Sequence, residues 1–252
     1  MSEPPAGSPP RGTPLRRSLW GWGPVLLLGT VLVSVAGYYG PWPWLLPLSQ
    51  AALAAPALAL AVRAGRSRTG VVLMLIWAAA MGGTVTVCAA RDPETGATSV
   101  VHGAAYAGEM LHWVRTGEGA EGDIRRFLPQ HALHLGVFLG LGVASGGILS
   151  LFFGAVLMNY MGYYVGSLAV AAGAPVPAVL LGWHPWSLFR IVAFVCLGVW
   201  VARGWFARGW RDAGVWRRDL GLVGVAGLGL VTDVLLKWSA AETWRGLLRS
   251  LL

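Results

Sequence analysis

The sequence predicts an all-α fold, a polytopic integral membrane bundle of six transmembrane helices, with a seventh left open. Three observations carry this prediction: 56% of the 252 residues are hydrophobic, only 12% are charged, and the mean hydropathy is +0.61. Soluble domains carry about 25% charged residues. The 36 glycines and 14 tryptophans agree with it, because glycine is frequent in membrane helices and tryptophan collects at membrane interfaces.

The apolar runs divide the chain into spans of about the 20 residues that a bilayer requires. Residues 1–19 are rich in proline, glycine and serine, and we expect a disordered cytoplasmic tail. The transmembrane bundle follows within residues 20–236. Its expected spans are 20–39, 45–62, 70–90, about 130–151, about 154–172 and 186–202. We expect the first span to stay uncleaved, since further spans follow at once.

The third, fourth and last apolar runs each contain residues that bear on helix packing or on the number of spans. Gly82-Gly83, in the third span, would let a neighbouring helix approach closely. Ser145-Gly146-Gly147 either ends the fourth span or forms a close-packing point inside it. A final run at 220–236 contains Asp233, so whether it crosses the membrane stays undecided, and residues 237–252 are predicted to form an interfacial helix.

Residues 91–126 are the one long polar stretch after the tail, and they carry six acids and four arginines. We expect this segment to face the extracytoplasmic side. Its middle, about 98–115, has the spacing of an amphipathic helix, with His102, Tyr106 and Glu109 on one face. The prediction is a helix that lies at the membrane surface.

Arginine placement predicts the orientation. Clusters at 11–17, 63–68 and 203–218 hold 11 of the 19 basic residues and fall on one side of the predicted spans. That side, with the N-terminus, is cytoplasmic by the positive-inside rule. The net charge of +8 is therefore explained by topology and anionic lipid, and nucleic acid is excluded as a partner. Arginine-rich, lysine-poor usage favours a GC-rich bacterium and its inner (cytoplasmic) membrane.

Four residues form a candidate catalytic or metal site. Glu109 and His112 are three residues apart, as are His131 and His134, and side chains at this spacing project from one helix face. If the two pairs met, Glu109 and three histidines would suit zinc or iron, and a metal-bound water there would hydrolyse a bond near the outer surface. The alternative is that the histidines face headgroups and water.

Three further polar residues lie in apolar surroundings. Asn159 must find a partner, either as interhelical hydrogen-bonding glue or in a transport or catalytic role. Arg190 follows His184 at a span entry, and we expect it to reach the headgroups, with anion binding as the alternative. Cys88 and Cys196 lie inside apolar runs and are expected to pack as small hydrophobic groups.

Residues 127–204 resemble the stage II sporulation protein M family of multi-span membrane proteins. The shared features are a glycine-rich span, the run from Asn159 through Gly162 to Gly166, a proline loop, and a histidine at a span entry, His184. That family has an acid shortly after the histidine, where this chain has Leu188-Phe189-Arg190. The resemblance implies a non-enzymatic protein that acts in an envelope complex.

A second resemblance is to the CAAX-type intramembrane proteases. Glu109 with Arg115, and the spacing from Phe127 to His131, are similar to the glutamate and F-x-x-x-H motifs of that family. The doubled glutamate is absent, the arginine spacing differs, and no H-x-x-x-N follows His184. This resemblance implies an intramembrane hydrolase.

These observations lead to two function hypotheses. The first is a non-enzymatic component of an envelope or transport assembly, whose glycine-rich spans pack against one another, a membrane-protein partner or a second copy. The second is an intramembrane hydrolase or protease with a Glu/His site on the extracytoplasmic side. A solute transporter that uses Asn159 ranks third, because no inverted repeat is evident.

Overall fold

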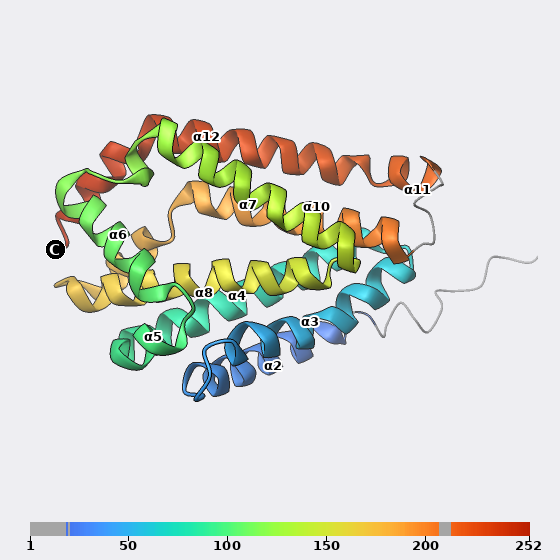
Figure 1. Ribbon diagram of the computed structural model, residues 1–252, viewed down its shortest axis with the longest axis horizontal. Helices are drawn as coiled ribbons and strands as arrows, with labels where there is room; N and C mark the ends of the chain where they lie inside the picture. The colour runs from blue at the N-terminus through green and yellow to red at the C-terminus, as the bar shows by residue number, and fades with distance from the viewer. Residues whose placement is uncertain (1–18, 20, 207–212) are drawn as a thin grey trace, which may run out of the picture.

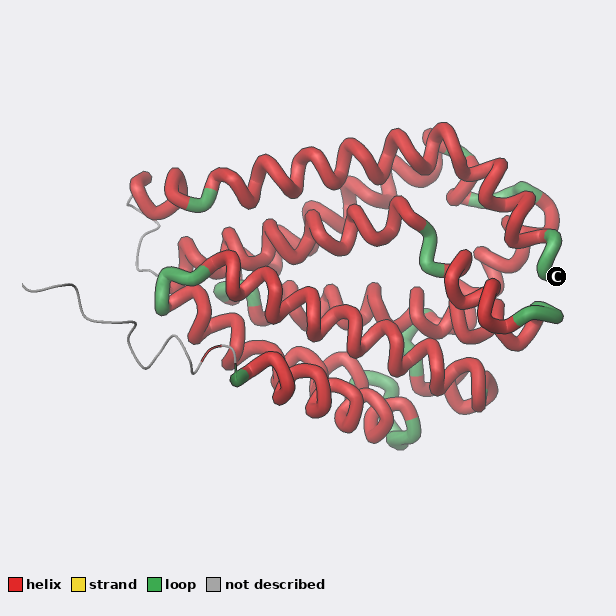
Figure 2. Tube along the Cα trace, turned by 180° about the vertical axis from the view of Figure 1, so that it is seen from behind, coloured by secondary structure: helices red, strands yellow, loops and turns green. Residues whose placement is uncertain are grey.

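The computed structural model describes Leu19, residues 21–206 and residues 213–252, and every regular element in this part of the chain is a helix (Figure 2). The predicted tail 1–19 lies outside the described residues apart from Leu19. Six helices are long and apolar enough to cross a membrane: α3 (Leu45–Arg63), α4 (Ser67–Arg91), α7 (Ile124–Ser145), α8 (Ile148–Ala171), α10 (Pro185–Phe206) and α12 (Leu220–Arg249). The predicted all-α polytopic bundle is confirmed.

The remaining elements are shorter. Helix α2 (Trp22–Tyr38) is apolar but has only 17 residues, so the first predicted span is shorter than expected. The others are α5 (Pro93–Ser99), α6 (Gly103–Thr116), the 3₁₀ turn η1 (Ala120–Gly122), α9 (Pro175–Gly182) and α11 (Ala213–Arg218). Figure 1 shows α5 and α6 at the end of the bundle that also holds the C-terminus, opposite the end that holds α11.

The C-terminal part of the chain differs from the prediction. The run 220–236 and the expected interfacial helix at 237–252 form one continuous helix, α12. The helix has no break at their boundary because Asp233 and Lys237 are both buried inside the bundle, where each has a charged partner. With α12 counted and α2 set apart as shorter, six helices meet the length of a span.

The predicted surface helix at 98–115 is two helices. Val100 is extended, and His102 has a left-handed backbone with φ of 64°, so α5 ends at Ser99 and α6 begins at Gly103. Met110, Trp113 and Val114 of α6 are buried, and they belong to the same hydrophobic core as Tyr164 of α8. Helix α6 therefore packs into the end of the bundle and covers it.

Helices α4 and α8 lie at the centre of the bundle, between α2 and α3 on one side and α7, α10 and α12 on the other (Figure 1). Glycines let their backbones meet. An added Cβ at Gly166 would lie 2.6 Å from the Thr86 carbonyl oxygen, and one at Gly162 would lie 3.0 Å from the Gly82 carbonyl oxygen. The close approach predicted at Gly82-Gly83 occurs at Gly82, whereas an added Cβ at Gly83 would meet nothing within 4 Å.

Asn159 takes the hydrogen-bonding role expected of it. Its side-chain amide exchanges two hydrogen bonds with that of Gln50 on α3, at 2.8 and 3.1 Å. Gln50 also donates to the Ser34 hydroxyl of α2, and its backbone carbonyl accepts from the Trp77 indole of α4. This buried network joins four helices, and it satisfies polar groups that would be costly to leave unpaired in the membrane.

The arginines of the described chain near 63–68 and 203–218 lie at one end of the bundle, as predicted. Arg203 donates to the Val62 carbonyl oxygen at 2.7 Å, and its Nε lies 3.4 Å from a carboxylate oxygen of Asp219. Ser67 donates to the same carboxylate oxygen of Asp219. At this end, Gly146 and Gly147 both adopt left-handed backbones and join α7 directly to α8, so the Ser145 junction ends a helix.

Candidate functional site

A buried charged cluster lies near the end of the bundle that α6 covers, and a loop delivers its central residue. Helix α6 ends at Thr116, where Gly117 has a left-handed backbone with φ of 84° that turns the chain back. The loop then packs on the Trp113 indole, so that an added Cβ at Gly122 would lie 3.1 Å from its nitrogen. This path carries Glu121, on the short turn η1, into the bundle.

Both carboxylate oxygens of Glu121 are engaged. One accepts a hydrogen bond from Lys237 Nζ of α12 at 2.7 Å. The other accepts from the Trp186 indole at 2.7 Å and lies 3.6 Å from His184 Nδ1. Lys237, only 2% exposed, also lies over the Phe127 ring, 4.4 Å from its centre. Glu121 therefore ties the loop to α10 and α12 at once.

Burial and neighbouring charges determine the protonation states of Glu121 and His184. Burial alone would raise the pKa of Glu121, but the charge of Lys237, the contact with His184 and the charge of Arg190 bring it well below its ordinary value. Burial lowers the pKa of His184, and the negative charge of Glu121 restores it only in part. At neutral pH Glu121 is ionised and His184 is uncharged.

We expect stability to fall on acidification for this reason. The pKa values of Glu121 and His184 are both lowered in the folded protein, so the unfolded chain binds these protons more readily. The free energy of unfolding should therefore fall once the pH drops below about 6.5, the ordinary pKa of histidine. One such proton costs at most about 1.4 kcal/mol per pH unit. Thermal unfolding in detergent at a series of pH values measures this, and His184→Gln should flatten the upper part of the curve.

The control for this prediction is His112→Gln, because the His112 side chain is 56% exposed at the surface. This variant should follow the wild-type curve. An unfolding temperature that is flat or that rises from about pH 7 to about pH 5 would contradict the assignment.

A second ion pair lies beside the first. Arg190 Nη2 of α10 is 3.2 Å from a carboxylate oxygen of Asp233 on α12, and Asp233 is 2% exposed. The expectation that Arg190 reaches the headgroups is thus wrong: its guanidinium is held by an acid inside the bundle. The two pairs together contain two positive and two negative charges.

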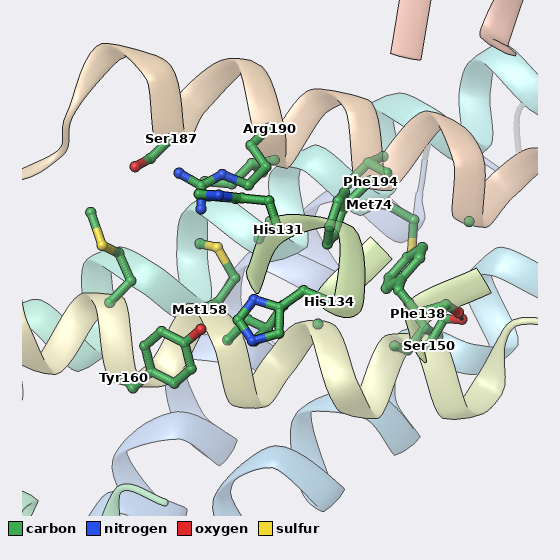
Figure 3. Close-up of a pocket in the computed structure, with 18 of the residues that line it drawn as sticks. Met74, His131, His134, Phe138, Ser150, Met158, Tyr160, Ser187, Arg190 and Phe194 are labelled. Atoms are coloured by element: carbon green, nitrogen blue, oxygen red, sulfur yellow. Dashed lines mark hydrogen bonds between the residues drawn. The ribbon is translucent and has the colours of Figure 1, made fainter. Parts of the chain in front are cut away.

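A partly open cavity of about 140 Å³ adjoins these pairs. This is room for about five water molecules at ~30 Å³ each. Its walls come mainly from α7, α8 and α10, and Glu121, Arg190 and Lys237 line one end of it. His131 and His134 of α7 line it as well. Figure 3 shows His134 and Tyr160 toward this polar end, with Phe138 and Phe194 toward the other.

The structure brings together only half of the predicted catalytic and metal set. Glu109 and His112 are exposed on α6 and do not line the cavity; His112 lies 3.8 Å from the exposed Glu118. Within the described residues no group of three or more His, Cys, Asp or Glu side chains is placed to hold a metal ion. Helix α6 turns these two residues outward because Met110, Trp113 and Val114 occupy its inner face.

Glu121, Lys237 and Asp233 were not predicted as site residues. Glu121 carries no distinguishing pattern, since it is one of six acids in a polar stretch. A usable pattern existed in the last helix: Asp233 and the one lysine of the chain, Lys237, are four residues apart in an apolar run. Residues at this spacing share a helix face, and ionisable residues inside membrane segments point to partners.

The carboxylate at the centre of the cluster already has a hydrogen-bond donor on each of its oxygens. Glu121 accepts strong hydrogen bonds on both oxygens and has a lowered pKa, so it is a poor general base. Ser150 lines the cavity, and its hydroxyl donates a hydrogen bond to the Phe138 carbonyl oxygen at 2.6 Å.

The fold and this site define a polytopic helical membrane protein with a charge-balanced polar interior. No family model, no curated protein and no solved structure matches the chain.

Proposed function

We propose that this protein is a non-enzymatic component of an envelope or transport assembly in the inner membrane of a bacterium. The observation that carries the proposal is a set of glycines that face away from the bundle on α7 and α12. An added Cβ would meet nothing within 4 Å at any of them; they are Gly136, Gly140, Gly221, Gly224 and Gly227.

No close contact within the described part of the monomer requires glycine at these positions. Glycine in a helix interior is destabilising by about 0.5–1 kcal/mol relative to alanine. Gly136 and Gly140 have the G-x-x-x-G spacing, which lets helices in membranes approach closely. Helices α7 and α12 are also the least buried of the six long apolar helices. Their outer faces suit a partner helix or a second copy of the chain.

The interior supports a structural role over catalysis. Glu121 and Asp233, the acids of the buried cluster, are each ion-paired. The resemblance to the stage II sporulation protein M family also implies work in an envelope complex. His184, which lacks the following acid of that family, lies beside the carboxylate of Glu121 instead. The hydrolase alternative rests on His131 and His134, which line the cavity.

The test measures complex size and function in the native host. In mild-detergent extracts, we expect the wild type to migrate well above its monomer mass of 26.6 kDa, and Gly136→Leu/Gly140→Leu to migrate as the monomer and fail to complement a deletion. Gly83→Leu, at a glycine that is also open on its Cβ side, is the matched control and should behave as wild type.

A second arm separates the two functions. A non-enzymatic component keeps its function when His131 and His134 are both replaced by alanine. Monomeric wild-type protein, together with loss of function in the double histidine variant at normal protein level, would favour the hydrolase and overturn the proposal.

The proposed orientation places the N-terminus in the cytoplasm and the Glu118 loop outside. The native cysteines, Cys88 and Cys196, are buried and give little background. We expect a membrane-impermeant maleimide to label Glu118→Cys in intact cells whose outer layers are opened, and to label Arg68→Cys only in inverted vesicles. The reverse pattern would contradict the positive-inside assignment.

A further inference from the structure

We propose that the partly open cavity binds a small uncharged aromatic alcohol, a single ring with one hydroxyl, of the size of phenol. The proposal concerns the inside of the bundle and does not depend on the outward glycines, so each proposal stands if the other fails. It rests on the volume of the cavity, on the residues at its two ends, and on the charges and hydrogen-bonding groups of its polar end.

The volume of the cavity sets the size of the ligand. An apolar protein cavity of about 150 Å³ takes up one benzene molecule, and this cavity has a volume of about 140 Å³. One aromatic ring with one small substituent therefore fits, whereas a second ring or an acyl chain does not. Because the cavity is partly open, a ligand of this size can enter without separation of the helices.

The apolar end of the cavity suits an aromatic ring. Phe138 of α7 and Phe194 of α10 line this end, with ring centroids 4.9 Å apart. Figure 3 shows Met74 of α4 at the same end. Aromatic rings and thioether sulfurs both make favourable contacts with a further ring. The glycines Gly154 and Gly198 also line the cavity, and their lack of a side chain leaves space for the ligand.

The polar end lies one helical turn from the apolar end. On α7, His134 precedes Phe138 by four residues, and residues at this spacing are neighbours on one helix face. On α10, Arg190 precedes Phe194 by the same spacing. Tyr160 of α8 also stands at the polar end (Figure 3). The ligand must therefore change from apolar to polar within the width of one ring, as phenol does.

The charges at the polar end favour an uncharged ligand. Glu121 pairs with Lys237, and Arg190 pairs with Asp233, so the four charges cancel. A carboxylate or an ammonium group on the ligand would add an uncompensated charge to this site, which is costly. Phenol ionises only near pH ~10, as the tyrosine side chain does, so at neutral pH it adds no charge.

The hydrogen-bonding groups of the polar end match a hydroxyl. His131 Nδ1 lies 2.7 Å from the Phe127 carbonyl oxygen and donates to it, so in the neutral ring Nε2 carries a lone pair. The Tyr160 hydroxyl makes no hydrogen bond to any residue in the described part of the chain. One partner thus accepts and the other donates. A hydroxyl does both, and it satisfies the two groups at once.

The test uses 4-fluorophenol and ¹⁹F NMR with the purified full chain in phosphatidylcholine nanodiscs. Empty nanodiscs measure partition of the probe into lipid, and the additional line broadening in the presence of the protein measures binding. We expect unlabelled phenol to displace the probe. Benzoate and benzylamine have the same ring but carry a charge at neutral pH, so displacement by either should need at least about tenfold higher concentrations.

Gly154→Leu is the variant that fills the cavity. An added Cβ at Gly154 would meet only the Phe138 ring, at an ordinary 3.8 Å, so the new side chain points toward a wall of the cavity without a clash. Both alanine and leucine are better helix formers than glycine, so folding should be kept, and the unfolding temperature checks this. We expect the affinity for the probe to fall about tenfold or more in Gly154→Leu and by less in Gly154→Ala, while Gly83→Leu stays within about twofold of wild type.

Tyr160→Phe tests the hydroxyl contact, because it removes one hydroxyl and keeps the ring, which packs on Tyr106 with centroids 4.5 Å apart. The affinity for the probe should fall about fivefold, the effect of one lost hydrogen bond. Tyr39→Phe is the matched control, since Tyr39 is 52% exposed, and it should bind as wild type does.

Three results would overturn the proposal. Line broadening no greater than that of empty nanodiscs, or equal in wild type and Gly154→Leu, would rule out the cavity as the site. Displacement by benzoate or benzylamine at the concentration that suffices for phenol would rule out selection of an uncharged ligand. An unchanged affinity in Tyr160→Phe would rule out the hydroxyl contact.

Discussion

Replacement of Glu121 by glutamine is expected to lower the free energy of unfolding by about 3–5 kcal/mol, the usual cost of removing one partner from a buried ion pair. Glutamine still accepts from the Trp186 indole, but Lys237, 2% exposed, is left without a negative partner at its Nζ. For a chain of this length the unfolding temperature should drop by about 6–20 °C in detergent.

Two variants make this expectation specific. Glu118→Gln alters an acid of the same loop whose side chain is 84% exposed, and it should leave the unfolding temperature unchanged. Glu121→Gln/Lys237→Met removes both charges and should recover most of the loss, because apolar replacement of a whole buried pair is often nearly neutral. If the Glu121→Gln protein were as stable as the Glu118→Gln protein, the ion pair of Glu121 with Lys237 would not be what holds this loop in place.

Replacement of Gly166 by alanine is expected to destabilise the bundle by about 1–3 kcal/mol. The new methyl carbon would lie 2.5 Å from Ala89 Cβ and 2.6 Å from the Thr86 carbonyl oxygen, so α4 and α8 must move apart. The same change at Gly83, where nothing lies within 4 Å, should stabilise by about 0.5–1 kcal/mol through helix propensity.

The two glycine substitutions should change the free energy of unfolding in opposite directions. Unfolding in mixed micelles with increasing denaturing detergent measures both changes relative to wild type. Equal effects at Gly83 and Gly166 would mean that the α4–α8 contact tolerates a wider separation than the packed structure indicates.

The fold was largely predictable because its determinants are local. Each span is a contiguous apolar run, and arginine clusters mark one end of the bundle whichever helices pack together. The boundaries were less accurate: α7 begins six residues before the predicted start, since Asp123 caps it by accepting from the Arg125 backbone N–H. Asp233 obscured the last helix, because a charge in an apolar run looks unfavourable until its partner is known.

The site was less predictable because its partners are distant in sequence. Glu121 meets Trp186 and Lys237 across 65 and 116 residues, and nothing near Glu121 distinguishes it from Glu118. The spacing of Glu109 and His112 gave a false lead, since it fixes only that both project from one face of α6 and leaves open which way that face turns. The pair His131 and His134 was a better guide, because α7 directs both to the cavity.

The engagement of Glu121 by Lys237 also bears on how the chain is made. The carboxylate emerges from the ribosome 116 residues before its ammonium partner, so until α12 enters the bilayer the loop has no counter-ion to dock on. We therefore expect the loop that carries Glu121 to remain protease-sensitive in nascent chains that end before residue 237, and to become protected once the last helix is inserted.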